Sequence, residues 1–214
     1  MMFAAGLRRG TGMSGSEAAA NCEADRPEIW LARHGETEWS RTMRHTGRTD
    51  IELTEAGREQ ARALRPALES HGFARVNSSP LSRALETCRL ALPSRSIEPS
   101  EALMEWDYGE YEGLTSKQIR ERRPGWVLWR DGCPGGETAA EVGARVDPLV
   151  AELLKSTEDV TLFAHGHVLR VLAARWLGLR PGDGALFALD TATLSILGWE
   201  HEEAVIRRWN SPLS

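Results

Sequence analysis

The sequence predicts an α/β fold in which helices cover both faces of a mostly parallel central sheet, giving a three-layer α/β/α sandwich. Short apolar runs of strand length alternate with longer segments of helical periodicity along most of the chain. Such alternation is typical of parallel strands joined by helical crossovers. Strand-like runs lead into turns that contain Gly35, Pro80 and Gly166. Because ligands of such sheets bind beyond the carboxyl ends of the strands, these turns mark the expected edge of a site.

The N-terminal half supplies three of the expected strands and two of the expected helices. Thr54 can cap the first helix, and alanines and leucines repeat along one face of that helix. A polar stretch over residues 36–53 separates it from the first strand. The expected elements are a strand at 28–32, a helix from Glu55 to about Ser70, a strand at 73–78, a helix at 81–92 and a short strand at 96–99.

The C-terminal half continues the alternation around a loop rich in Trp, Gly and Pro over residues 124–136. The run at 159–164 is apolar on both faces, which predicts a buried parallel strand. The expected elements are a helix from Thr115 to about Arg122, a long helix at 137–155, the strand at 159–164, a helix at 167–178 and two last strands near 185–198 and 204–209.

Length and composition indicate one folded domain of ordinary character. The chain has 214 residues, and we expect residues 27–214 to form that domain. The formal net charge of −5 argues against a nucleic-acid partner, and no apolar run is long enough for a membrane span. Cys22, Cys88 and Cys133 are odd in number and scattered, so we interpret them as free thiols of a cytoplasmic protein.

Residues 1–26 differ from the rest of the chain, because they are rich in Gly, Ala, Ser and Arg and show no helical or strand periodicity. They also lack the apolar core of a secretory signal peptide. We expect a disordered tail or an over-extended start, with Met13 as the true initiator. An organellar transit segment is the other alternative, because Arg8 and Arg9 precede the first acidic residue, Glu17.

The turn after the first strand, Arg33-His34-Gly35, brings an imidazole, a fixed cation and an unhindered amide to one point. A neutral imidazole is nucleophilic, and a guanidinium grips phosphate oxygens with paired donors. Glycine would let an anion approach the main chain. A second pair, His165-Gly166, and the turn Ser78-Ser79-Pro80 follow other strands. Together these turns favour chemistry at a phosphorus atom.

Four motifs occur in a fixed order over about residues 27–178. They are Arg33-His34-Gly35-Glu36-Thr37 with Arg44-x-Thr46-Gly47; Ser78-Ser79-Pro80-Leu81-Ser82-Arg83; Leu103-x-Glu105 with Tyr108-Gly109-x-x-Glu112-Gly113; and Ala164-His165-Gly166. Each motif alone is weak, but the ordered set is specific. The set resembles the histidine phosphatase superfamily, whose fold is that of phosphoglycerate mutase.

The resemblance implies a catalytic role for five residues. His34 is expected to be the nucleophile and to form a phosphohistidine intermediate. Arg33, Arg83 and His165 are expected to surround the transferred phosphoryl group and to offset its charge. Glu105 is expected to protonate the leaving alkoxide and then to activate water. Asp107 in the same loop is the alternative candidate for this acid.

The resemblance also implies a set of substrate contacts and the absence of a cofactor. No metal is expected, because arginines and histidines supply the positive charge and the carboxylates lack the spacing of a metal site. The partner is expected to be a small phosphorylated metabolite, and a homo-oligomer is left open. The expected substrate contacts are Ser40, Thr46, Gly47, Tyr108, Gly166 and His167.

The run Trp129-Arg130-Asp131-Gly132-Cys133-Pro134-Gly135-Gly136-Glu137 is similar to a loop of a narrower branch, which contains sedoheptulose-1,7-bisphosphatase and actinobacterial-type acid phosphatases. The run Phe163-Ala164-His165-Gly166-His167-x-Leu169-Arg170 resembles that branch too. Arg130 lies next to Trp129 and two residues before Gly132, so packing and a bend could deliver it to the pocket. We expect it to contact the far end of a sugar bisphosphate. The alternative is a surface arginine paired with Asp131.

The resemblance leaves three functional hypotheses. The favoured one is metal-independent hydrolysis of a small sugar phosphate or bisphosphate. The first alternative is a phosphoglycerate mutase, but only 60 positions separate Glu105 from His165, fewer than mutases carry, and Ser40 stands where mutases usually have Asn. The second alternative is a non-catalytic phospho-ligand-binding module, which the retained histidines and arginines disfavour.

Overall fold

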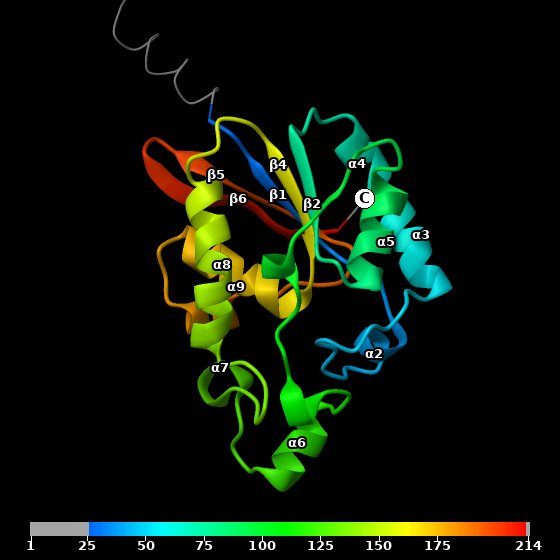
Figure 1. Ribbon diagram of the computed structural model, residues 1–214, viewed down its shortest axis with the longest axis vertical. Coiled ribbons are helices and arrows are strands. Elements are labelled where there is room, and N and C mark those ends of the chain that lie inside the picture. Colours follow the sequence, from blue (N-terminus) through cyan, green and yellow to red (C-terminus); the bar gives the residue numbers. More distant parts are fainter. Residues whose placement is uncertain (1–25, 213–214) are drawn as a thin grey trace, which may run out of the picture.

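The computed structural model describes residues 26–212, and a six-stranded sheet in the order β3-β2-β4-β1-β5-β6 forms the centre of this part (Figure 1). β1 to β4 run parallel to one another, whereas β5 and β6 are antiparallel additions at one edge. The strands are β1 (Ile29–Arg33), β2 (Arg75–Ser78), β3 (Glu98–Pro99), β4 (Val160–Ala164), β5 (Leu194–Glu200) and β6 (Glu203–Ser211).

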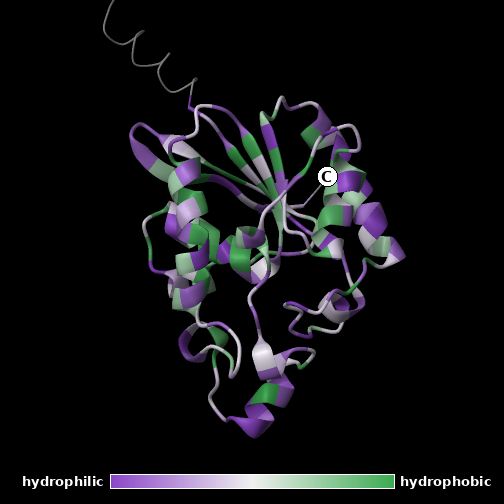
Figure 2. Cartoon of the chain, viewed as in Figure 1, coloured by the Kyte–Doolittle hydropathy of each residue, from purple (hydrophilic) through white to green (hydrophobic). Residues whose placement is uncertain are grey.

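Helices cover both faces of this sheet, which confirms the predicted three-layer α/β/α sandwich. One face packs on α8 (Ala139–Leu153) and α9 (Gly166–Trp176). The other packs on α4 (Arg65–Glu69) and α5 (Ser82–Ala91), and α3 (Glu55–Ala63) packs on α5. Successive side chains of a strand point to opposite faces, so Ile29 and Leu31 join the first core and Ala32 the second. Hydrophobic colours accordingly run through the central strands (Figure 2).

Shorter elements lie below the carboxyl ends of the parallel strands as drawn in Figure 1. Thr37 and Thr115 each cap one of these helices through a reciprocal capping box, which satisfies amides that would otherwise lack acceptors. The short elements are α2 (Glu38–Arg41), α6 (Ser116–Arg122), α7 (Leu128–Asp131) and the 3-10 turns η1 (Glu101–Leu103), η2 (Gly109–Tyr111) and η3 (Pro181–Leu186).

The structure differs from the predicted elements in three places. The single helix expected from Glu55 to Ser70 is divided at Leu64, because Pro66 has no amide hydrogen and its ring clashes with the preceding helical turn. The strand expected near 185–198 begins only at Leu194, and η3 occupies the residues before it. Short helices, α2 and α7, interrupt the two stretches expected to be loops.

The expected tail, residues 1–26, lies outside the described part of the chain except for Arg26. Its guanidinium stacks over the Trp199 ring at 4.4 Å from the ring centroid. Cys22 also lies outside the described residues, whereas Cys88 and Cys133 are free and buried. Among the described helices, none is long and apolar enough to cross a membrane.

Candidate active site

The turns after β1, β2 and β4 lie side by side because the three strands are parallel neighbours. In this register Arg33 is opposite Ala164, and Ser78 is opposite Phe163. The His34 amide donates to the Ala164 carbonyl at 3.0 Å, and the Ser79 amide donates to the Phe163 carbonyl at 2.9 Å. The sheet therefore brings the two His-Gly turns and the Ser-Ser-Pro turn to one point, as expected.

His34 is held as a neutral imidazole with one nitrogen available for attack. Its Nδ1 lies 2.7 Å from the Gly35 carbonyl oxygen, which can only accept, so the proton is on Nδ1 and the lone pair is on Nε2. Burial holds the pKa of His34 well below its usual range, and the charges of Arg83 and Arg33 lower it further. These are the properties of a nucleophilic histidine.

Gly35 has a different use from the one expected. Its amide donates to Thr87 Oγ1 at 3.1 Å and is therefore not open to an anion. A Cβ at this position would lie only 2.2 Å from the Gly57 carbonyl oxygen. The glycine permits the first turn of α3 to pack against the His34 turn, so its role is close packing of two backbones.

His165 faces His34 with ring centroids 5.1 Å apart, and Ser79 fixes its tautomer. Ser79 Oγ already accepts from the Leu81 amide at 3.3 Å and lies 2.8 Å from His165 Nε2. No other acceptor is found for the Ser79 hydroxyl proton within the described residues, so we interpret this proton as donated to Nε2 and His165 as protonated on Nδ1. Within the described residues this Nδ1 is buried and has no hydrogen-bond partner.

Arg83 is a buried cation and Arg33 a half-buried one, and the Nε of each lacks a hydrogen-bond partner in the described part of the chain. The carboxylate nearest to Arg83 is that of Asp50, whose Oδ1 lies 4.0 Å from Nη1. Arg83 is 0% exposed, and its terminal nitrogens donate to the Thr46, Gly47 and Thr49 carbonyls at 2.8–3.1 Å. Arg33 donates to the Leu189 carbonyl. Both Nε atoms are buried. Burying a guanidinium is costly unless an anion is near it, so both side chains indicate an anionic ligand.

Thr46 and Gly47, two of the expected substrate contacts, hold Arg83 through their carbonyls. The Thr46 side chain also lines the pocket. The Gly47 amide donates to Glu112 Oε1 at 2.7 Å, and a Cβ there would lie 2.5 Å from the Trp106 carbonyl oxygen. Gly47 therefore joins this loop to the segment that carries Glu105, and its amide is occupied.

Glu105 is 4% exposed and lies against the N-terminus of α9. Its Oε1 accepts from the Trp106 and Val168 amides, both at 2.9 Å, and its Oε2 accepts from the His167 amide at 3.0 Å. Carboxylates are favoured at helix N-termini, where amides lack partners. The alternative acid, Asp107, is turned elsewhere: its Oδ1 accepts from the Gly109 amide at 2.9 Å, and it does not line the pocket.

Tyr108 and His167 form a second polar pair at the pocket. Burial is the main cause that raises the pKa of Tyr108 well above its usual range and lowers the pKa of His167 well below its own. The protonated phenol therefore donates to His167 Nδ1 at 2.6 Å. The proton of His167 is then on Nε2, which gives the pocket a neutral donor.

A cavity of about 90 Å³ lies among most of these groups, but Arg83, His165 and Gly47 are not among its lining residues. Four of its residues had no assigned role in the sequence interpretation: Arg44, His45, Arg170 and Leu189. Arg44 and Arg170 belong to motifs identified in the sequence, so the sequence contained a signal for them. It did not show that their side chains point into the pocket. A larger depression of about 620 Å³ lies next to the start of β1 and carries none of the motif residues. The lining residues of the cavity are Arg33, His34, Ser40, Arg44, His45, Thr46, Glu105, Tyr108, Gly166, His167, Arg170 and Leu189.

Arg130 is not brought to this pocket. Its Nη2 donates to Asp131 Oδ2 at 2.8 Å and to the Gly125 carbonyl at 2.7 Å, and the side chain is 66% exposed. It borders a separate depression with Arg180. This arrangement is the alternative interpretation, a surface ion pair with Asp131. The adjacent carboxylate binds the guanidinium, so the side chain does not extend to the pocket.

The site thus places a buried neutral histidine beside one buried and one half-buried arginine, with an acid at a helix N-terminus, and this arrangement suits the binding of a phosphoryl group. The sequence profile of the histidine phosphatase superfamily (branch 1) matches residues 29–212. The chain belongs to this superfamily and is a phosphatase.

Known proteins similar to this chain include two phosphatases and a mutase. An acid phosphatase from Mycobacterium tuberculosis is 45% identical, with 81% of this chain and 87% of the relative covered. Sedoheptulose 1,7-bisphosphatase from Saccharomyces cerevisiae is 34% identical over 72% of this chain and 68% of its own. A 2,3-bisphosphoglycerate-dependent phosphoglycerate mutase from Methylorubrum extorquens is 38% identical over 66% and 75%.

The fold is shared with a solved structure of an open reading frame product from Mycobacterium tuberculosis. The two chains superpose with a TM-score of 0.83 and are 41% identical, and the match covers 88% of this chain and 99% of the other. The likeness therefore extends over nearly all of the described residues.

Proposed function

We propose that the chain hydrolyses phosphomonoesters of small metabolites by transferring the phosphoryl group to Nε2 of His34. The observation that carries this proposal is a set of three unpartnered buried donors around that histidine. They are Arg33 Nε, Arg83 Nε and His165 Nδ1. A phosphoryl group presents three terminal oxygens, so it supplies the acceptors that these donors lack.

The proposed reaction has two displacements with His34 as the transient carrier. In the first, Nε2 attacks phosphorus, the ester P–O bond breaks, and Glu105 gives its proton to the leaving alkoxide. In the second, water attacks phosphorus while the Glu105 carboxylate takes a proton from it, and the P–N bond breaks. Arg33, Arg83 and His165 offset the charge on the phosphoryl oxygens in both steps.

Hydrolysis is favoured over mutase activity by the short connection between Glu105 and His165. The 60 positions from Glu105 to His165 contain η2, α6, α7, α8 and β4, and Tyr108 is the one described residue between the two that lines the pocket. Water therefore competes well as the acceptor of the phosphoryl group. A mutase would interconvert 3- and 2-phosphoglycerate, stimulated by 2,3-bisphosphoglycerate, faster than it releases phosphate.

The substrate that we propose is a sugar phosphate, with a bisphosphate preferred. The named substrate of one relative is a sugar bisphosphate, which supports this class. Arg44 and Arg170 add two cations to the pocket lining. Arg170 is held rigidly, since Nε donates to the Gly184 carbonyl at 3.1 Å and its guanidinium stacks on Trp129 at 4.6 Å. In place of Arg130, these two arginines are the candidates for the second anionic group.

The decisive experiment is phosphate release over a panel of phosphorylated metabolites with a chelator present. We expect turnover of sugar phosphates without added metal. Among the described residues no group of three or more His, Cys, Asp or Glu side chains is placed to hold a metal ion. Activity that chelator abolishes and Mg²⁺ restores would count against the site, and binding without any turnover would favour the phospho-ligand-binding alternative.

Two further expectations accompany this proposal. We propose a cytoplasmic location, which the free thiols of Cys88 and Cys133 support, because disulfides are rare in reducing compartments. A homo-oligomer stays a prediction, and light scattering of the purified chain tests it.

A further inference from the structure

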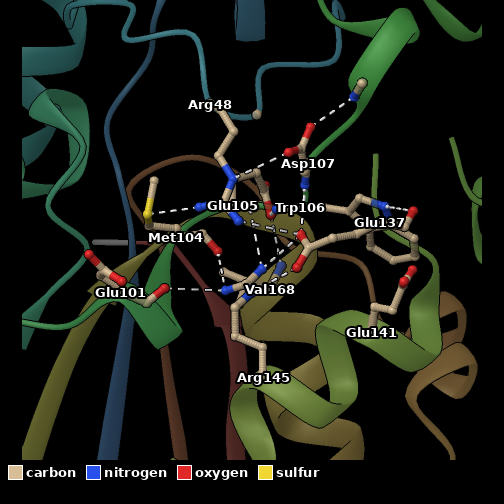
Figure 3. A network of polar contacts seen from close by, with 12 residues as sticks. Arg48, Glu101, Met104, Glu105, Trp106, Asp107, Glu137, Glu141, Arg145 and Val168 are labelled. Atoms are coloured by element: carbon tan, nitrogen blue, oxygen red, sulfur yellow. Dashed lines mark hydrogen bonds and ion pairs between the residues drawn. The ribbon is translucent and has the colours of Figure 1, made fainter. Parts of the chain in front are cut away.

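Arg145 of α8 and Glu137, which precedes this helix, form an ion pair next to the loop that carries Glu105 (Figure 3). Arg145 Nε lies 2.9 Å from Glu137 Oε1, and its Nη2 lies 3.1 Å from Oε2. The two side chains are only 19% and 17% exposed. Such paired contacts fix the direction of a guanidinium as well as its position.

Arg145 and Glu137 use their remaining atoms to hold the main chain on both sides of Glu105. On one side, Arg145 Nη1 donates to the Ala102 and Met104 carbonyls at 2.8 and 2.9 Å. On the other side, the Asp107 amide donates to Glu137 Oε2 at 2.8 Å. The acid therefore lies between two main-chain anchors that belong to one ion pair.

Two more charged side chains, Arg48 and Asp107, lie near this pair. Arg48 Nη2 lies 3.7 Å from Glu137 Oε2, and Arg48 Nε lies 3.8 Å from Asp107 Oδ2. The cluster of Arg48, Asp107, Glu137 and Arg145 thus contains two positive and two negative side chains. Because its charges are balanced internally, its role is to hold the loop.

We propose that Arg145 and Glu137 are positioning residues for the acid–base steps of Glu105. This inference rests on the proposed function, in which Glu105 protonates the leaving alkoxide and later deprotonates water. Two amides of α9, those of His167 and Val168, hold the Glu105 side chain. The Arg145–Glu137 pair holds the main chain on both sides of Glu105. The Glu137 main chain adds two hydrogen bonds to this loop, from its amide to the Asp107 carbonyl and from Trp106 Nε1 to its own carbonyl, both at 2.8 Å. A small displacement of a catalytic group is expensive, because proton transfer needs hydrogen-bond geometry.

The leaving group separates this role from a general structural one. An alkoxide needs a proton from Glu105 as the P–O bond breaks, whereas p-nitrophenolate is a stable anion and leaves without one. A displaced acid therefore slows the first step for an alkyl phosphate such as glycerol 2-phosphate. With p-nitrophenyl phosphate it spares the first step and slows only the attack of water on phosphohistidine.

The experiment compares Arg145→Ala and Glu137→Gln with Glu105→Gln on both substrates. For Arg145→Ala we expect kcat on glycerol 2-phosphate to fall roughly tenfold or more, equivalent to about 1.4 kcal/mol, with KM almost unchanged. With p-nitrophenyl phosphate we expect a rapid burst of one nitrophenolate per site, followed by slow turnover. Glu137→Gln keeps an acceptor for the Asp107 amide. We therefore expect the same dependence on the leaving group, with a smaller loss of kcat on glycerol 2-phosphate.

The matched control is Arg175→Ala, which removes another arginine–carboxylate pair. Arg175 Nε lies 2.7 Å from Asp147 Oδ1, and this pair joins α9 to α8 without touching the loop at 101–107. We expect wild-type kinetics from this variant. If Arg145→Ala does not fold, Glu137→Gln and Arg145→Lys, which keeps the charge but loses the paired donors, give the same comparison.

A double variant completes the test. If Arg145 acts through Glu105, then Arg145→Ala should add little to Glu105→Gln, because the group that it positions is already lost. Fully multiplicative losses, or a nitrophenolate burst slowed as much as the release of glycerol from glycerol 2-phosphate, would overturn the inference. If Glu105→Gln itself shows no dependence on the leaving group, the acid assignment fails and the inference fails with it. If only the Arg145 and Glu137 variants lack that dependence, the acid assignment stands and the positioning role alone is wrong.

Discussion

Different kinds of contact hold the two parts of the candidate site: the turns at the strand ends and the loops around them. His34, Ser79 and His165 directly follow strands, and the register of the parallel sheet decides where they lie. The loop that carries Glu105 is instead fixed by side chains that come from far along the chain, such as Arg145. The first part is therefore as rigid as the sheet, whereas the second depends on a few replaceable pairs. The predictions below test this difference.

The largest effect is expected from His34→Ala. Removal of a covalent nucleophile typically costs several orders of magnitude in turnover. Rapid acid quenching with ³²P-labelled substrate should show no labelled protein for this variant, whereas the wild type should give label that is stable in base and lost in acid. Label retained by His34→Ala would place the nucleophile at another residue.

Ser79→Ala should have the next largest effect, because it frees the tautomer of His165. Without the hydroxyl, nothing directs the His165 proton to Nδ1, and the buried donor for the phosphoryl group is lost part of the time. We expect kcat to fall roughly tenfold, or about 1.4 kcal/mol, with KM changed less.

Ser78→Ala is the matched control for this change. Ser78 is equally buried, but its hydroxyl donates only to the Ser79 carbonyl, at 2.9 Å. Its loss should leave kcat near the wild-type value. Equal losses in both serine variants would assign Ser79 to packing of the turn and not to the tautomer.

Much of the first part of the site followed from the sequence, because a strand end and its turn are local features. The motifs placed Arg33, His34 and His165 at the ends of two neighbouring strands, and the sheet gives them that arrangement. Arg83 follows the third strand end, in the first turn of α5. The sequence did not indicate that Ser79 sets a tautomer. That role depends on two hydrogen bonds at one oxygen, which only coordinates show.

The loops were harder to predict for a physical reason. Arg130 is followed in the chain by the carboxylate of Asp131. An ion pair between neighbouring residues loses less conformational entropy than a contact across the pocket would. Arg170 and His45 line the pocket because of helix and loop directions that no periodicity reveals. The division of the first long helix was readable from Pro66, since proline disrupts the interior of a helix.

Acid should destabilise the protein through its buried neutral histidines. Burial lowers the pKa of His34, His165 and His167 well below the ordinary value of 6.5, and it lowers the pKa of His45 to about 4. The unfolded chain therefore binds protons first as the pH falls below about 6.5, so the free energy of unfolding should decrease from there downward.

Urea unfolding between pH 7.5 and pH 5 measures this effect (on the order of 1.4 kcal/mol per pH unit for each fully buried histidine). The variant His34→Ala lacks one of the four groups and should show a shallower slope. An unchanged slope would mean that His34 is not held neutral, which would weaken the nucleophile assignment.

The smallest effect is expected from Arg130→Ala, and it separates the two ways in which a second anionic group could be recognised. The sequence suggested a loss confined to bisphosphates, but the side chain is 66% exposed and paired with Asp131 outside the pocket. A surface ion pair outside the pocket contributes little, so we expect changes below roughly twofold on both a sugar bisphosphate and p-nitrophenyl phosphate. Arg170→Ala provides the contrast, because Arg170 lines the pocket and its loss should damage kcat/KM for the bisphosphate selectively.

A loss of about tenfold for Arg130→Ala, confined to the bisphosphate, would show that the 124–136 loop moves over the pocket when substrate binds. The loop would then take part in binding, and the contrast between a fixed strand-end site and separately held loops would extend to the recognition of the substrate's far end.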